Sequence, residues 1–100
     1  MHFLIIARDG TDAQALERRM AAREAHIAVF REGLEAGQNL VGGALLSEEG
    51  AMQGSMLVVE FDDRETLNEW LKTDPYVTGD VWQDIEVIPF KLAGMVGKAA

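Results

Sequence analysis

Hydrophobic residues occur in short runs separated by polar stretches, and the spacing within these runs predicts four strands. The strands are expected over residues 2–8, 38–46, 55–61 and 82–92. The third run, SMLVVEF, is apolar on both faces, so we expect both sides of the sheet to be covered. Gly42 and Gly43 interrupt the second run, which predicts a break or a β-bulge. Pro89 in the last run cannot donate to a strand ladder and favours a sheet edge or a bulge.

A long amphipathic helix is predicted between the first two strands. Thr11 or Asp12 provides an N-cap, and Gly37 is well placed to end the helix. The apolar positions fall on one stripe, which consists of Leu16, Met20, Ile27, Phe30 and Leu34. Arg23 lies in the widest gap of this series and is expected at the centre of the stripe. His26 lies on its flank, about 80° away, beside small residues that leave room for a ligand.

A second helix is predicted after the third strand. Asp62 as N-cap and Glu65 at the third helical position have capping-box spacing, and the buried face consists of Leu67, Trp70 and Leu71. Asp74 followed by Pro75 predicts one short further turn of helix, because aspartate is a favoured N-cap and proline a favoured first residue.

The elements follow the order β-α-β-β-α-β. This order predicts a single α+β domain over residues 1–100, with a ferredoxin-like antiparallel sheet and two helices on one face. The other face of the sheet would be apolar but bare. Two copies packed sheet to sheet would cover it, so we predict a homodimer.

The composition narrows the classes of function. The formal charge of −8 argues against a nucleic-acid partner, which requires a cationic surface. Several arginines are interleaved with glutamates on the first helix, and we favour a solvated face over a functional basic patch for this cluster: Arg18, Arg19, Arg23 and Arg31. The chain has no cysteine and only two, distant histidines, so we expect no metal site.

Two further expectations concern cofactors and location. No nucleotide-binding fingerprint is present, so we expect no cofactor. No apolar run approaches the roughly 20 residues that cross a bilayer, so we expect no membrane partner. The absence of cysteine fits a reducing compartment, and we expect a cytoplasmic protein.

His26 is the main candidate for chemistry, because imidazole takes up and returns a proton near neutral pH. It needs a carboxylate to fix its tautomer, and Asp74 is the natural candidate. Both residues have structural alternatives: His26 as a solvated helix residue and Asp74 as a helix cap alone. The spacing leaves these alternatives open.

Four further residues are candidates for substrate binding: Arg23, Ser55, Gly43 and Tyr76. A guanidinium near the core needs a structural carboxylate or an anionic ligand, and Arg23 fits either case. Ser55 can bond a ligand or the local backbone. Gly43 permits close approach of a ligand, or else it forms part of the bulge.

Five short motifs occur in an order that resembles the YCII-related family. They are REAHI at 23–27, GG at 42–43, GSMLVVEF at 54–61, DPYV at 74–77 and VIPFK at 87–91. The resemblance implies a dimeric α+β barrel whose cleft holds a histidine and an aspartate, here His26 and Asp74, with Ser55 completing it. Glu24 and Ile27 stand where the family more often has proline and leucine, and neither touches the expected chemistry.

The same resemblance suggests a reaction class. A few related proteins remove chloride from chlorinated hydroxyquinols, and the wider superfamily includes muconolactone isomerases and cofactor-free monooxygenases. We therefore expect a cofactor-independent enzyme that uses His26 and Asp74 for acid/base chemistry on a small aromatic-derived or lactone-like acid, as an isomerase, dehydrochlorinase or lyase. A non-catalytic small-molecule-binding or accessory domain is the alternative. A cavity below about 300 Å³ would favour a structural dimer without a pocket.

Overall fold

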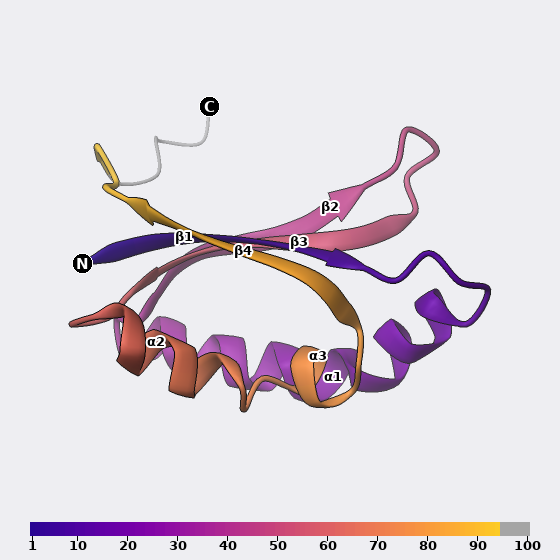
Figure 1. Cartoon of the computed structure of the whole chain (residues 1–100), viewed down its shortest axis with the longest axis horizontal. Coiled ribbons are helices and arrows are strands. Elements are labelled where there is room, and N and C mark those ends of the chain that lie inside the picture. Colours follow the sequence, from indigo (N-terminus) through magenta and orange to yellow (C-terminus); the bar gives the residue numbers. More distant parts are fainter. Residues whose placement is uncertain (95–100) are drawn as a thin grey trace.

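The structure is a computed structural model that describes residues 1–94 (Figure 1). Its elements are β1 (His2–Asp9), α1 (Ala15–Glu35), β2 (Asn39–Leu46), β3 (Met52–Glu60), α2 (Arg64–Leu71), α3 (Pro75–Thr78) and β4 (Trp82–Phe90). The strands form one antiparallel sheet in the order β2-β3-β1-β4, and the helices lie together on one face of it. This arrangement confirms the predicted ferredoxin-like topology. Pro89 lies in the edge strand β4, as its missing N–H predicts.

The core lies between the sheet and the helices. Alternate residues of β1 point toward the helices and are buried: Phe3, Ile5 and Ala7. The register sets them opposite Val59, Leu57 and Ser55 of β3. Leu67 and Leu71 of α2 cover one end of this layer, and Tyr76 of α3 is buried with them. The helix-facing side of the sheet is therefore apolar at the end of Phe3 and Val59, and it becomes polar at the other end, where Ser55 lies.

The predicted break or bulge at Gly42 and Gly43 is wrong. Both residues continue β2 in regular pairing, Gly42 opposite Leu57 and Gly43 opposite Met56, and the register shifts lie nearer the two ends of the strand. Gly42 is instead required for close packing, since a Cβ atom there would lie 2.7 Å from Cε1 of Phe30. The absence of a side chain at this position lets the Phe30 ring lie against the sheet.

The buried face of α1 differs from the predicted stripe. The residues that are buried on it are Ala15, Arg19, His26 and Gly33. Three residues of the predicted stripe, Leu16, Met20 and Leu34, are 50%, 52% and 43% exposed. At about 100° per residue, the observed and predicted stripes lie roughly 90° apart around the helix. The helix is turned this way because its polar residues have partners in the sheet and in α3.

Two helix starts differ from the sequence expectation by a few residues. Gln14 precedes α1 without making a side-chain cap, whereas Asp12 lies in the turn before it. Asp63, rather than Asp62, caps α2, and its Oδ1 accepts a hydrogen bond from the backbone N–H of Thr66 at 2.7 Å. This hydrogen bond lowers the pKa of Asp63.

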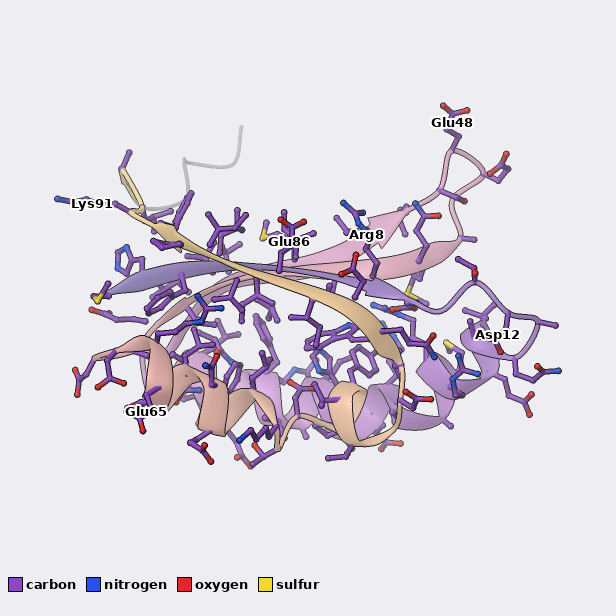
Figure 2. The ribbon with its side chains drawn as sticks, viewed as in Figure 1. Arg8, Asp12, Glu48, Glu65, Glu86 and Lys91 are labelled. Carbon is purple, nitrogen blue, oxygen red and sulfur yellow. The ribbon has the colours of Figure 1, made fainter. Side chains whose placement is uncertain are left out.

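No described helix covers the second face of the sheet. The strand registers place on it an apolar group that includes Leu4, Ile6, Met56, Val58 and Ile88. Figure 2 shows Arg8 and Glu86 projecting from this same face, away from the helices. This is the face on which we predict a second copy to pack.

Candidate functional site

The short helix α3 holds Asp74 in a fixed position. Pro75 occupies the start of this helix and Asp74 caps it, as predicted, with Oδ1 accepting a hydrogen bond from the Tyr76 N–H at 2.9 Å. The same oxygen lies 2.8 Å from Nδ1 of His26 on α1. One carboxylate oxygen therefore both caps α3 and contacts the histidine.

This contact determines which nitrogen of His26 carries the proton when the ring is neutral. An ionised carboxylate only accepts hydrogen bonds, so Nδ1 donates to Asp74 and Nε2 keeps its lone pair. The His26 side chain is 11% exposed, and its ring stacks on Tyr76 with centroids 3.8 Å apart and meets the edge of Trp82 at 5.4 Å. Aromatic packing and the carboxylate together hold the ring in one orientation and leave Nε2 as a hydrogen-bond acceptor in the neutral ring.

Arg19 is the buried guanidinium of the site, a place that the sequence pattern assigned to Arg23. Its Nη1 lies 3.1 Å from both carboxylate oxygens of Asp9, and its Nη2 donates to Oγ of Ser55 at 3.1 Å. The side chains of Arg19 and Asp9 are each 4% exposed. The interpretation of Arg19 as part of a solvated face is therefore wrong, because it forms a buried ion pair.

Ser55 links three elements at the polar end of the sheet. It lies on β3, and its Oγ accepts hydrogen bonds from Arg19 on α1 and from Nε1 of Trp82 on β4, each at 3.1 Å. Its neighbours across the sheet are Ala7 on β1 and Ala44 on β2. These small side chains leave space beside the Ser55 hydroxyl.

A cavity of about 170 Å³ opens beside these groups. His26 and Phe30 line it from α1, Ser55 and Leu57 from β3, and Tyr76 from α3. Its volume is smaller than the roughly 300 Å³ of ordinary ligand sites. A cavity below this size is the result that we expected for a structural dimer without a pocket. An apolar cavity of about 150 Å³ nevertheless holds benzene, so this one has room for a single six-membered ring.

Arg23 and Gly43 border the cavity at its exposed rim. Within residues 1–94, Arg23 forms no ion pair with a carboxylate. Arg23 is exposed rather than buried in a stripe, so it adds a positive charge to the mouth of the cavity. A Cβ atom at Gly43 would meet nothing within 4 Å, but it would lie on the uncovered face of the sheet, where Met56 is its neighbour, so Gly43 borders the cavity through its backbone alone.

Tyr76 lies between the charged groups of the site. Burial raises the pKa of its hydroxyl, and the positive charges of Arg19 and Arg23 oppose that change. The guanidinium carbon of Arg19 lies 4.8 Å from the centre of the tyrosine ring. Near neutral pH the hydroxyl of Tyr76 is therefore protonated and available as a donor.

Most of the predicted site residues meet around the cavity. His26, Arg23, Ser55, Gly43 and Tyr76 line it, and Asp74 lies behind the histidine. The sequence reasoning missed three contributors: Arg19, Phe30 and Trp82. The available signal for Arg19 was its spacing of two helical turns from the histidine, which places both side chains on one helix face.

Residues 1–94 contain neither a metal-binding cluster nor a membrane-spanning helix. No cluster of three or more histidine or acidic side chains could hold a metal ion there. None of the helices in the same range is long and apolar enough to cross a bilayer.

The chain is similar to known proteins over most of its length. The YCII-related domain matches residues 1–91. Protein YciI of Escherichia coli O6:H1 is 33% identical over 97 residues, covering 91% of this chain and 97% of that protein. An uncharacterized protein of Haemophilus influenzae is 32% identical with the same coverage.

A solved enzyme structure shares the fold. It is 5-chloro-2-hydroxyhydroquinone dehydrochlorinase (TftG) from Burkholderia phenoliruptrix AC1100, in complex with 2,5-dihydroxybenzoquinone. The two structures superpose with a TM-score of 0.76 at 27% identity, over 91% of this chain and 94% of that one. Together with the match over residues 1–91, these similarities confirm the predicted assignment: the chain belongs to the YCII-related family.

Proposed function

We propose that this protein is a cofactor-independent enzyme that moves protons on a small molecule with a single ring. In this proposal Nε2 of His26 is the general base and later the general acid, and Asp74 orients the ring and stabilises its charged form. The observation that carries the proposal is the 2.8 Å contact between His26 Nδ1 and Asp74 Oδ1 beside the cavity. The reaction would be of isomerase, dehydrochlorinase or lyase type.

The cavity also limits the substrate. A volume of about 170 Å³ accepts one ring, and apolar contacts from Phe30 and Leu57 favour a planar one. Arg23 at the rim favours an anionic group, such as a carboxylate or a phenolate. The ligand of the dehydrochlorinase relative, 2,5-dihydroxybenzoquinone, has this character. We infer a small aromatic-derived or lactone-like acid as the substrate class.

The proposal is tested with two probes. The first is chloride release from 5-chloro-2-hydroxyhydroquinone, and the second is exchange of the ring hydrogens of 2,5-dihydroxybenzoquinone for deuterium, followed by NMR. Acid/base catalysis predicts that the wild type accelerates at least one of these reactions and that His26→Gln lowers the rate about 10²- to 10⁴-fold. His2→Gln, which changes the one other histidine, should keep the wild-type rate.

The same experiment separates catalysis from simple binding. A different result would identify the alternative, a small-molecule-binding or accessory domain. In that case the wild type would bind the quinone, His26→Gln would bind it more weakly, and the wild type would transform neither probe. If the wild type neither binds nor transforms either probe, the proposal of an enzyme for such rings fails.

We further propose that the working form is a cytoplasmic homodimer packed through the uncovered sheet face. The apolar group on that face supports the pairing, since a monomer would leave Ile88 exposed and Leu4, Ile6 and Met56 partly exposed to water. The lack of cysteine agrees with a reducing compartment.

A further inference from the structure

The hydrogen bonds at Ser55 use the whole accepting capacity of its hydroxyl oxygen. A serine oxygen has two lone pairs and one hydrogen. The guanidinium of Arg19 and the indole N–H of Trp82 are donors with no acceptor atom, and both point at Oγ from 3.1 Å. Both lone pairs are therefore occupied, and the only remaining hydrogen-bonding direction of Ser55 is its own O–H.

The O–H group has no acceptor among the residues that the structure describes. Ser55 makes two hydrogen bonds through its side chain within residues 1–94, and it is the acceptor in both. It lines the cavity and is otherwise 3% exposed, with alanines opposite it on both neighbouring strands. The proton is thus left to point into the cavity.

We infer that Ser55 is an obligate hydrogen-bond donor to the ligand, and that the site therefore selects a ligand with an acceptor oxygen at this point. A ring carbonyl, an enolate or a phenolate oxygen has the required lone pair. His26 offers the opposite polarity, because its Nε2 accepts. A ligand that matches both groups carries an acidic hydrogen conjugated to a carbonyl.

This assignment argues against a Ser-His-Asp hydrolase, which the residue types would otherwise suggest. In such a triad the serine hydroxyl donates to the histidine, which takes its proton during attack. Here Ser55 accepts hydrogen bonds from Arg19 and Trp82, and the described contacts of His26 include none with Ser55. In this assignment Ser55 keeps its proton and donates a hydrogen bond to the ligand.

The donor also has a place in the proposed proton transfer, and this part of the inference rests on the proposed function. When Nε2 of His26 removes a proton from the ligand, the electron pair of the broken bond moves into the conjugated carbonyl, whose oxygen becomes negative. Ser55 donates to that oxygen, and Arg19 behind it strengthens the donation as a positioning residue. In an isomerisation the proton held by His26 returns to another ligand atom. In a dehydrochlorination the electron pair on the oxygen moves back and expels chloride, and the proton passes to water, so neither reaction consumes a further reagent.

Neutron diffraction from deuterated wild-type crystals tests the assignment without any substitution. We expect the deuterium of Ser55 to point into the cavity, toward ordered water in the free protein and toward a probe oxygen after soaking with 2,5-dihydroxybenzoquinone. Deuterium on Arg19 and Trp82 should point at Oγ. A Ser55 deuterium directed at His26, at Asp9 or at the backbone would overturn the inference, even if the protein proved catalytic.

A binding series gives a second, independent measurement. Ser55→Ala should weaken binding of 2,5-dihydroxybenzoquinone by about tenfold in calorimetry, whereas Ser55→Thr, which keeps the hydroxyl, should recover most of the affinity. Equal affinities of the wild type and Ser55→Ala would count against the donor. A tenfold loss of binding in Ser55→Ala, together with no proton exchange by the wild type, would refute the proposed catalysis and support the donor.

Discussion

Two arginines one helical turn apart should differ in how much stability the protein loses when each is replaced by methionine. Arg19 is buried against Asp9, whereas Arg23 is exposed at the rim of the cavity. Arg19→Met keeps the aliphatic stem but leaves the Asp9 carboxylate buried without its cation. Breaking a buried ion pair from one side costs about 3–5 kcal/mol. A small domain has only about 5–15 kcal/mol of stability in total, so this variant should lose a large part of it.

The assay is urea unfolding at one fixed protein concentration, followed by tryptophan fluorescence. With a slope of about 2 kcal/mol per molar urea, the midpoint of Arg19→Met should fall by roughly 2 M. Arg23→Met should stay within about 0.5 kcal/mol of the wild type, because the side chain is exposed. The same variant should bind the anionic quinone about fivefold more weakly at low salt.

A double variant, Arg19→Met with Asp9→Leu, checks the reasoning further. Removing both charges should recover most of the stability lost by Arg19→Met, because no unpaired ion is left in the interior. If Arg19→Met and Arg23→Met unfold at the same urea concentration, or if the effects of the two changes at Arg19 and Asp9 simply add, the argument for a buried ion pair is refuted.

Three further predictions address the cavity wall, the tyrosine and the uncovered sheet face. Gly42→Ala would bring a Cβ atom to 2.7 Å from Phe30, so its free energy of unfolding should fall about 1–3 kcal/mol below that of Gly43→Ala, where space is open. Tyr76 is the single tyrosine of the chain, and burial raises its pKa; tyrosinate absorbance should therefore develop at higher pH in the folded chain than in urea. Because the unfolded chain releases this proton first, stability should decline as the pH rises above about 10, and coincident titrations would contradict this. Ile88→Glu on the uncovered face should convert the predicted dimer to a monomer in sedimentation velocity, and an unchanged mass would exclude that face.

The strands and their order could be predicted because they depend on short-range periodicity. Phe3 and Ile5 alternate with outward residues, and the position of Pro89 agrees with an edge strand. The β-α-β-β-α-β order then leaves few ways to build one sheet. The errors at this level are a β3 strand that begins at Met52, three residues earlier than predicted, the helix starts, and the glycines of β2, where the deciding contact, between Gly42 and Phe30, is tertiary.

The orientation of α1 could not be predicted from hydrophobic periodicity. Its buried face includes Arg19 and His26, whose partners Asp9, Ser55 and Asp74 belong to other elements. Polar groups that find such partners are buried without an isolated charge, so the helix does not turn its most apolar stripe inward. The expectation that His26 and Asp74 share a cleft came from the family resemblance, since spacing alone left the alternatives open.

One oxygen of Asp74 both caps α3 and contacts His26. Two substitutions of Asp74 separate its structural role from its chemical role. Asp74→Asn keeps an oxygen that can cap α3 and accept from His26, so the fold should remain near wild-type stability. The neutral amide cannot stabilise a charged imidazole, so proton exchange on 2,5-dihydroxybenzoquinone should fall at least 10²-fold. Asp74→Ala should in addition lose about 2–4 kcal/mol, because the His26 and Tyr76 N–H groups are left buried without an acceptor. Asp63→Ala is the matched control, since it removes an exposed cap and should destabilise less. An Asp74→Asn protein with full exchange activity would show that the carboxylate serves only as a cap.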